Sequence, residues 1–147
     1  MGSAALFTIG FTRKSAAEFF GILRQAKITK LVDVRLNNVS QLAGFTKRDD
    51  LAFFLREICG CDYEHRPLFA PTKDLLDGYK QGTIPWDEYE SRFCSLLRDR
   101  EVEKHMTLVD LDQACLLCSE PTADRCHRRL AAEYLRDKLG SLLVTHL

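Results

Sequence analysis

Short apolar runs alternate with amphipathic segments along the chain, and this alternation is the feature that most restricts its fold. The runs are rich in β-branched and aliphatic residues and too short to be helices. Between them, apolar residues recur every three or four positions, as on the buried face of a helix. Strands that alternate with helices form mainly parallel sheets, because each helix returns the chain to the start of the next strand. We therefore expect an α/β fold with a mainly parallel sheet of about five strands, at residues 5–9, 30–35, 62–69, 114–118 and 142–146.

The helices between these strands are marked by capping and breaking residues, and we expect them on both faces of the sheet. A Ser or Thr followed three residues later by an acidic residue is typical of a helix start, proline favours the first turn, and glycine favours the end. These rules predict helix starts at the pairs Ser15/Glu18 and Thr46/Asp49, at Pro85, and at a cap on Thr122 or Asp124. They predict the end of the last helix at Gly140.

Size and composition fit one cytoplasmic domain that spans residues 1–147. The chain has 147 residues, of which 46% are hydrophobic, enough for a single core. Its 21 basic residues balance its 21 acidic residues, which makes a general nucleic-acid binder unlikely. No apolar run approaches the roughly 18 residues that span a bilayer. Most of the six cysteines lie in apolar runs or beside reactive groups, which favours a reducing cytoplasm over a secreted disulfide scaffold.

The densest set of reactive side chains follows the strand predicted at residues 114–118. Cys118 and Glu120 share a face if the chain stays extended there. Cys126 and His127 fall in the first turn of the last helix, where free amides and the helix dipole stabilise an anion. A thiol in such a position has a lowered pKa. We predict Cys126 as a nucleophile, with His127 or Glu120 moving protons; the alternative is that Cys126 is an ordinary packed residue.

A metal site is an alternative interpretation of the same segment. Cys115, Cys118, Cys126 and His127 supply four donors of the types that bind zinc. Residues three apart on a strand point to opposite faces, so Cys115 belongs to the core. Cys118, Cys126 and His127 remain as the alternative metal set. The leading interpretation requires neither a metal nor another cofactor.

Further candidates lie at the ends of the other strands, where parallel sheets bind ligands. Asp33 and Arg35 are two residues apart and share a face, so a carboxylate and a guanidinium fork are available for a small anionic ligand. The alternative is a charge pair that closes the end of the sheet. Arg128 is a second candidate for the anion, and Gly10 and His146 complete the ligand-binding set at the ends of the first and last strands.

A series of short motifs runs along nearly the whole chain. They are Thr8-Ile9-Gly10, Leu31-Val32-Asp33-Val34-Arg35, Phe45, Tyr63-Glu64-His65, Trp86 to Tyr89, Leu116-Leu117-Cys118-Ser119-Glu120, Cys126-His127-Arg128 and Val144-Thr145-His146. In this order they resemble a bacterial and archaeal family known as domain of unknown function 488. The resemblance implies one α/β domain with its important positions at the candidates above, but no established reaction. Two departures stand out: Phe11 replaces the histidine that often follows Thr-Ile-Gly, and residues 36–38 lack the usual proline and serine or basic residue.

The leading functional hypothesis is an enzyme that acts on a small phosphate- or carboxylate-bearing ligand, with nucleotides among the candidates. Arg128 is only two residues beyond Cys126, so the Cys-x5-Arg loop of cysteine phosphatases is absent. Two hypotheses from other classes stay open. One is a non-catalytic metal-binding or redox-sensing protein that uses Cys118, Cys126 and His127. The other is an interaction module in which the site only supports a binding surface.

Overall fold

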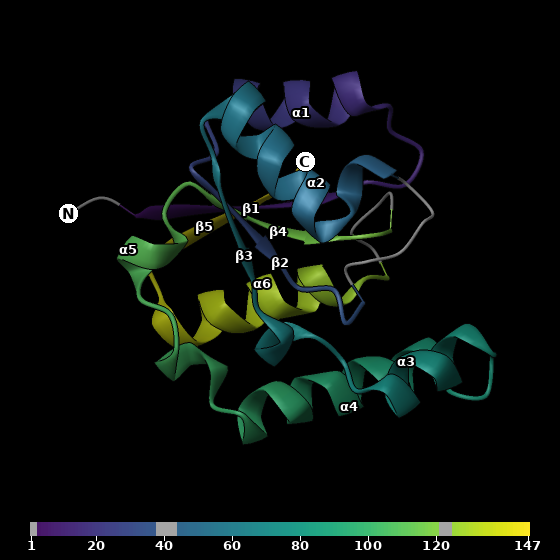
Figure 1. Cartoon of the computed structure of the whole chain (residues 1–147). Coiled ribbons are helices and arrows are strands. Elements are labelled where there is room, and N and C mark those ends of the chain that lie inside the picture. The colour runs from purple at the N-terminus through teal and green to yellow at the C-terminus, as the bar shows by residue number, and fades with distance from the viewer. Residues whose placement is uncertain (1–2, 38–43, 121–124) are drawn as a thin grey trace.

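The computed structural model describes residues 3–37, 44–120 and 125–147 and contains one five-stranded, wholly parallel sheet (Figure 1). The strand order is β3-β2-β4-β1-β5, which places β4 at the centre. The predicted α/β class and strand number are confirmed. The strands are β1 (Ala4–Gly10), β2 (Lys30–Asp33), β3 (Asp62–His65), β4 (Ala114–Cys118) and β5 (Leu142–His146).

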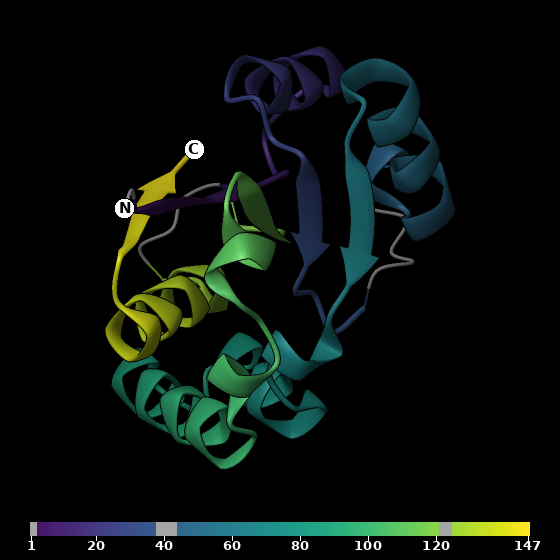
Figure 2. The ribbon, with the colours of Figure 1, turned by 90° about the vertical axis from the view of Figure 1, so that its left-hand side faces the viewer.

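Helices cover both faces of the sheet, and the second face carries two layers (Figures 1 and 2). Helices α1 and α2 lie on one face. Helix α6 lies on the other, with α3 and α4 packed outside it. The helices are α1 (Ala16–Gln25), α2 (Arg48–Phe54) with a π-helical turn at Leu55–Cys59, α3 (Lys73–Lys80), α4 (Trp86–Asp99), α5 (Leu108–Leu111) and α6 (His127–Leu139). None of the described helices is long and apolar enough to cross a membrane.

The alternation of side chains along β4 divides the core in two. Cys115 and Leu117 pack with α1 and α2, whereas Leu116 and Cys118 pack with α4 and α6. Cys115 is fully buried, and its burial raises the pKa of its thiol well above the ordinary value. The predicted assignment of Cys115 to the core is therefore confirmed, and Cys118 faces α6.

Some predicted helix boundaries are confirmed and others are wrong. Ser15 and Glu18 form the expected reciprocal capping box. Helix α2 is instead preceded by Lys47, which gives no side-chain cap, because Thr46 is buried in a 3₁₀ turn at Gly44–Thr46. Cys126 is the N-cap residue of α6, while the predicted caps Thr122 and Asp124 lie outside the described residues.

Two strands are shorter than predicted. Strand β2 ends at Asp33, two residues before Arg35. Strand β3 ends at His65, because Pro67 cannot donate a ladder hydrogen bond and begins a 3₁₀ turn at Pro67–Phe69. Pro85 and Gly140 bound α4 and α6 as expected.

The carboxyl ends of all five strands meet at one edge of the sheet, and β1 and β4 approach each other closely there. The amide of Phe11 donates to the Cys118 carbonyl, and that of Thr12 donates to the Ser119 carbonyl, so pairing continues past both strand ends. A Cβ atom at Gly10 would lie 1.5 Å from the Glu120 carbonyl oxygen and 2.9 Å from Arg128 Nη1. Only glycine fits this position without displacing Glu120.

Replacing Gly10 should therefore destabilise the chain, whereas replacing a glycine with open space around it should not. We expect Gly10→Ala to lower the free energy of unfolding by about 1–3 kcal/mol through overpacking. Gly21 in α1 has open space around its Cβ position, so Gly21→Ala should raise stability by about 0.5–1 kcal/mol. Urea denaturation of both variants measures these changes, and equal effects would contradict the close approach.

Candidate functional site

A cavity of about 220 Å³ opens at the carboxyl edge of the sheet, and it gathers most of the reactive side chains. Residues after β1, β2 and β4 form one side of it, and α3, α4 and the start of α6 form the other. Its walls consist of Phe11, Arg35, Leu36, Asn37, Leu76, Tyr79, Lys80, Tyr89, Cys118, Ser119, Glu120, Arg125, Cys126 and His127.

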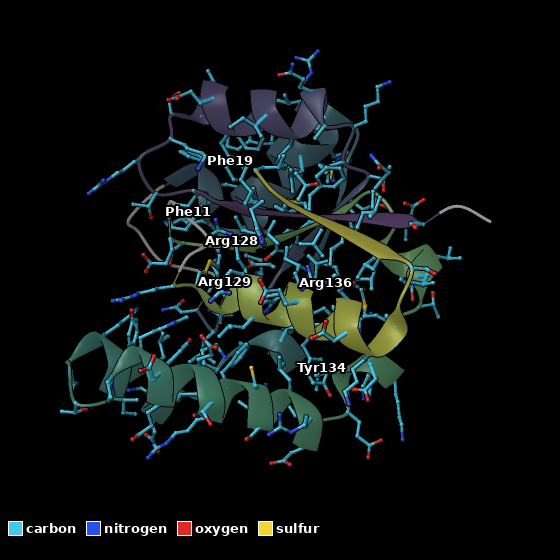
Figure 3. All side chains as sticks on the ribbon, turned by 180° about the vertical axis from the view of Figure 1, so that it is seen from behind. Phe11, Phe19, Arg128, Arg129, Tyr134 and Arg136 are labelled. Carbon is cyan, nitrogen blue, oxygen red and sulfur yellow. A yellow bond between two sulfur atoms is a disulfide. The ribbon has the colours of Figure 1, made fainter. Side chains whose placement is uncertain are left out.

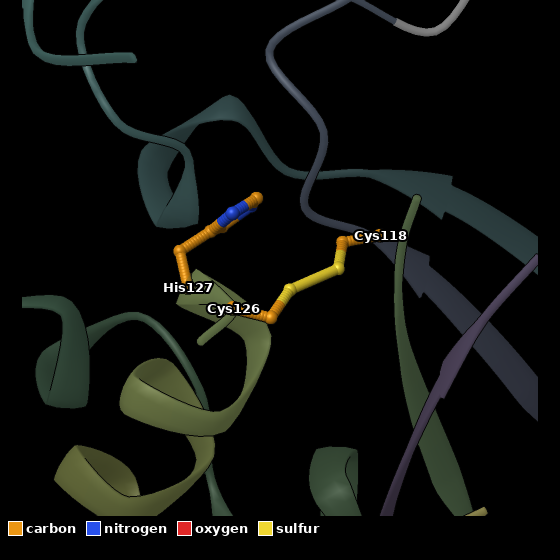
Figure 4. A group of neighbouring side chains, drawn as sticks. All are labelled: Cys118, Cys126 and His127. Atoms are coloured by element: carbon orange, nitrogen blue, oxygen red, sulfur yellow. A yellow bond between two sulfur atoms is a disulfide. The ribbon is translucent and has the colours of Figure 1, made fainter. Parts of the chain in front are cut away.

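Cys118 and Cys126 meet at the floor of this cavity. Cys118 is the last residue of β4, Cys126 precedes the first turn of α6, and both side chains are buried. A disulfide joins the two sulfur atoms (Figure 4). Their Cα atoms are 7.7 Å apart, beyond the range of about 4.4–6.8 Å that disulfides usually span. The pair is therefore close enough to react together but wide for a permanent structural crosslink.

His127 completes this cluster with a fixed ring orientation. Its Nε2 donates to the Val34 carbonyl at 2.7 Å, and its ring contacts Phe93 edge-on at 5.6 Å. With the proton on Nε2, the lone pair lies on Nδ1. Burial, with the nearby charge of Arg128, lowers the pKa of His127 to about 4. The imidazole is therefore neutral at physiological pH.

Cys118, Cys126 and His127 each offer one donor atom, and the three atoms lie within 4.8 Å of one another. Two thiols and a neutral imidazole suit either of two kinds of chemistry. They can act as a nucleophile with its base, or as soft to borderline metal ligands.

Arg128 supports the cluster from behind, between the sheet and α6 (Figure 3). The side chain is fully buried. Nη1 donates to the Glu120 carbonyl at 2.7 Å and lies 3.3 Å from Cys118 Sγ, while Nε donates to Thr8 Oγ1 at 3.2 Å. Nη2 has no hydrogen-bond partner among the described residues. Burial lowers the pKa of the guanidinium, which nevertheless stays charged near neutral pH and faces Cys118 Sγ.

Asp33 and Arg35 form a buried ion pair at the end of β2, where Arg35 also lines the cavity. Arg35 Nε and Nη2 each lie 2.8 Å from one carboxylate oxygen of Asp33, and Nη2 also donates to the Thr46 carbonyl. The Tyr63 hydroxyl donates to the same carboxylate at 2.6 Å, and the guanidinium lies over the Phe11 ring. The geometry matches the alternative predicted for this pair, an ion pair that closes the end of the sheet.

The structure brings five of the predicted site residues together on the cavity wall: Arg35, Cys118, Glu120, Cys126 and His127. Asp33, Gly10 and Arg128 lie behind that wall. His146 is further away on β5, where its Nδ1 and the Thr8 hydroxyl form a hydrogen bond of 2.6 Å. Thr8 thereby links His146 to Arg128.

Sequence reasoning did not identify four other residues of the cavity wall: Tyr79, Lys80, Tyr89 and Arg125. Tyr89 is buried, and its burial raises the pKa of its hydroxyl. No local pattern marks Tyr79 and Lys80, because their position depends on how α3 packs. Arg125 directly precedes Cys126, so its place in the sequence could have indicated it.

The fold and this cluster define a single-domain α/β protein with a cysteine–histidine site at the carboxyl edge of a parallel sheet. The family model described as domain of unknown function DUF488 matches residues 15–135. The chain therefore belongs to this family, and the resemblance seen in the sequence is confirmed. No curated protein and no solved structure matches the chain.

The lowered pKa of His127 predicts a loss of stability in acid. Since the pKa falls from 6.5 in the unfolded chain to about 4 in the folded chain, the unfolded state binds a proton first. The stabilisation is complete above pH 6.5 and decreases as the pH falls towards 4, by up to ~3 kcal/mol. Urea denaturation of the reduced, metal-free protein between pH 7 and pH 4 measures this slope. His127→Gln should show a flatter profile, and parallel profiles would contradict the assignment.

Proposed function

We propose that this protein is an enzyme that acts on a small phosphate- or carboxylate-bearing ligand in the cavity next to Cys126. The observation that carries the proposal is the convergence of Cys118, Cys126 and His127 on one cavity wall with two cationic side chains, Lys80 and Arg125. Structural cysteines need no such cavity, whereas a nucleophile does.

Recognition of an anion is supported by the charges around the cavity. Lys80 and Arg125 are exposed and form no ion pair with any described residue. The amides at the start of α6 point their positive dipole end towards the same region. Arg35 contributes less to the recognition of an anion than expected, because its Nε and Nη2 already donate to the Asp33 carboxylate.

The aromatic part of the wall favours a ligand with a flat apolar group. Phe11, Tyr79 and Tyr89 all line the cavity. A nucleotide combines such a group with a phosphate, and its base can stack on a ring of this kind. Nucleotides are therefore the first ligands to test. The volume of about 220 Å³ suits a small metabolite and not a polymer.

The proposed chemistry starts from the reduced protein, as expected in a cytoplasmic environment. His127 Nδ1 accepts the proton of the Cys126 thiol, and the thiolate attacks an electrophilic carbon or phosphorus atom of the ligand. The bond to the leaving group breaks with its electron pair, and Glu120 protonates that group. Water then attacks the bound ligand and gives a proton to Glu120, the sulfur leaves with the electron pair of its bond to the ligand, and His127 returns its proton to Cys126.

Alkylation provides the direct test of a reactive Cys126. In the reduced protein, iodoacetamide should modify Cys126 at least about tenfold faster than Cys94, because His127 can accept the proton of Cys126, whereas burial raises the pKa of the Cys94 thiol. Mass spectrometry of each cysteine peptide measures the rates. Equal rates at Cys126 and Cys94 would refute the nucleophile.

Turnover of phosphorylated and carboxylated metabolites provides the second test. Any activity found in such a library should fall by at least about 10³-fold in Cys126→Ser and stay unchanged in Cys94→Ser. If neither turnover nor ligand binding emerges, a redox sensor becomes the better hypothesis, because the Cys118–Cys126 disulfide is the bond that such a sensor would form.

A further inference from the structure

Three features of the cluster go beyond what a thiol nucleophile requires. The first is the number and type of donors. A nucleophile needs one sulfur and one base, whereas this cluster has two sulfur atoms and one imidazole nitrogen within 4.8 Å. Two cysteines and a histidine are the protein ligands of one class of zinc site, in which the fourth position stays open to water or substrate.

The second feature is the orientation of His127. A metal-binding histidine usually donates its other ring N–H to a carbonyl or carboxylate, which fixes the tautomer and aims the lone pair. The Val34 carbonyl, 2.7 Å from Nε2, does this for His127 and leaves Nδ1 as the donor. The segment that directly follows β2 thus supplies the outer hydrogen bond that a metal-binding histidine needs.

The third feature is the spacing of the two cysteines. Two thiolates on one zinc ion lie about 3.8 Å apart, given Zn–S bonds of about 2.3 Å, whereas bonded sulfurs lie about 2.05 Å apart. Cysteines that share a metal therefore tolerate a wider backbone separation, and the Cα atoms of Cys118 and Cys126 are 7.7 Å apart. Arg128 Nη1 lies 3.3 Å from Cys118 Sγ, so a buried positive charge faces one of the two sulfur ligands.

From these features we infer that Cys118, Cys126 and His127 Nδ1 bind one divalent cation of the zinc class, with the fourth coordination position facing the cavity. The reduced protein takes up the cation and releases one proton from each thiol, with no electron transfer. The disulfide form cannot bind it in this way until a dithiol reductant supplies two electrons and two protons and is itself oxidised to a disulfide.

Occupancy of this site has a direct consequence for the proposed reaction. The cation uses the Cys126 lone pair that would attack the ligand, so the metal-bound form has its nucleophile blocked. This consequence rests on the proposed function, whereas the metal site itself does not. Zinc removal then activates the enzyme, and zinc uptake inhibits it.

The test is a zinc titration of the full-length protein, reduced and freed of metal, in competition with a chromophoric chelator. We expect one zinc ion per chain. The affinity should fall at least about 100-fold in Cys118→Ser and Cys126→Ser and at least about tenfold in His127→Gln. Cys94→Ser is the matched control and should bind as the wild type does. Circular dichroism verifies that each variant is folded.

Cobalt(II) provides a measurement on the wild type alone, in case a variant fails to fold. Tetrahedral cobalt bound to two thiolates should give a sulfur-to-metal charge-transfer band and intense visible bands. Zinc should also slow the alkylation of Cys126 at least about tenfold and leave that of Cys94 unchanged, and a chelator should reverse the effect.

The outcomes separate the metal site from the proposed function. Zinc binding that persists in the Cys118→Ser/Cys126→Ser double variant, or that leaves Cys126 alkylation unchanged, would overturn the metal site. So would a wild-type protein that takes up no zinc, even if Cys126 is reactive and turnover is found. One bound zinc together with an unreactive Cys126 in the metal-free protein would support the metal site and refute the proposed nucleophile.

Discussion

The buried guanidinium of Arg128 is the interaction on which the arrangement of the site depends. A fully buried cation is costly unless its donors are satisfied. Thr8 on β1, Cys118 at the end of β4 and the Glu120 carbonyl accept from Nε and Nη1 of Arg128, and Nη2 has no partner among the described residues. Thr8 is 120 residues from Arg128 in the sequence, whereas Cys118 and Glu120 are 10 and 8 residues away. Folding therefore has to bring β1 to the segment between β4 and α6 around one charge. The start of α6, where the reactive residues lie, is held in place by the same contacts.

A buried ion pair at the end of β2 fixes the site from another side. The Asp33–Arg35 pair receives the Tyr63 hydroxyl and reaches the Thr46 carbonyl, which ties the ends of β2 and β3 to the turn before α2. Val34 lies between the two charged residues, and its carbonyl selects the tautomer of His127. The backbone carbonyl that follows β2 thus fixes the orientation of the His127 side chain on α6.

The elements themselves could be predicted from the sequence because they depend on local patterns. The five strands, the Ser15 capping box and the placement of Cys115 in the core follow from periodicity and from the chemistry of helix starts. The errors fall where tertiary packing decides. Thr46 has the side chain of a cap, yet it is buried in a turn whose carbonyl accepts from Arg35.

The site was only partly predictable for the same reason. Parallel strands imply that their carboxyl ends meet, which located Cys118, Cys126 and His127 correctly at one edge. Whether a given arginine faces the cavity or the core could not be derived, because it depends on which neighbour balances its charge. Asp33 balances Arg35, and Arg128 packs behind Cys118. The contributions of Lys80 and Tyr79 required the position of α3, which no local pattern encodes.

The cysteine at the start of α6 has an evolutionary consequence. Helix N-caps favour Ser, Thr, Asp or Asn, whose side-chain oxygens accept a hydrogen bond from the first turn and add about 1 kcal/mol of stability over a residue that cannot. Cys126 occupies this position and makes no such bond. Selection for stability alone would therefore replace it with serine or aspartate. The cysteine at this position therefore forgoes the stability that a serine or aspartate cap would add, and in exchange places a sulfur atom at the start of the helix.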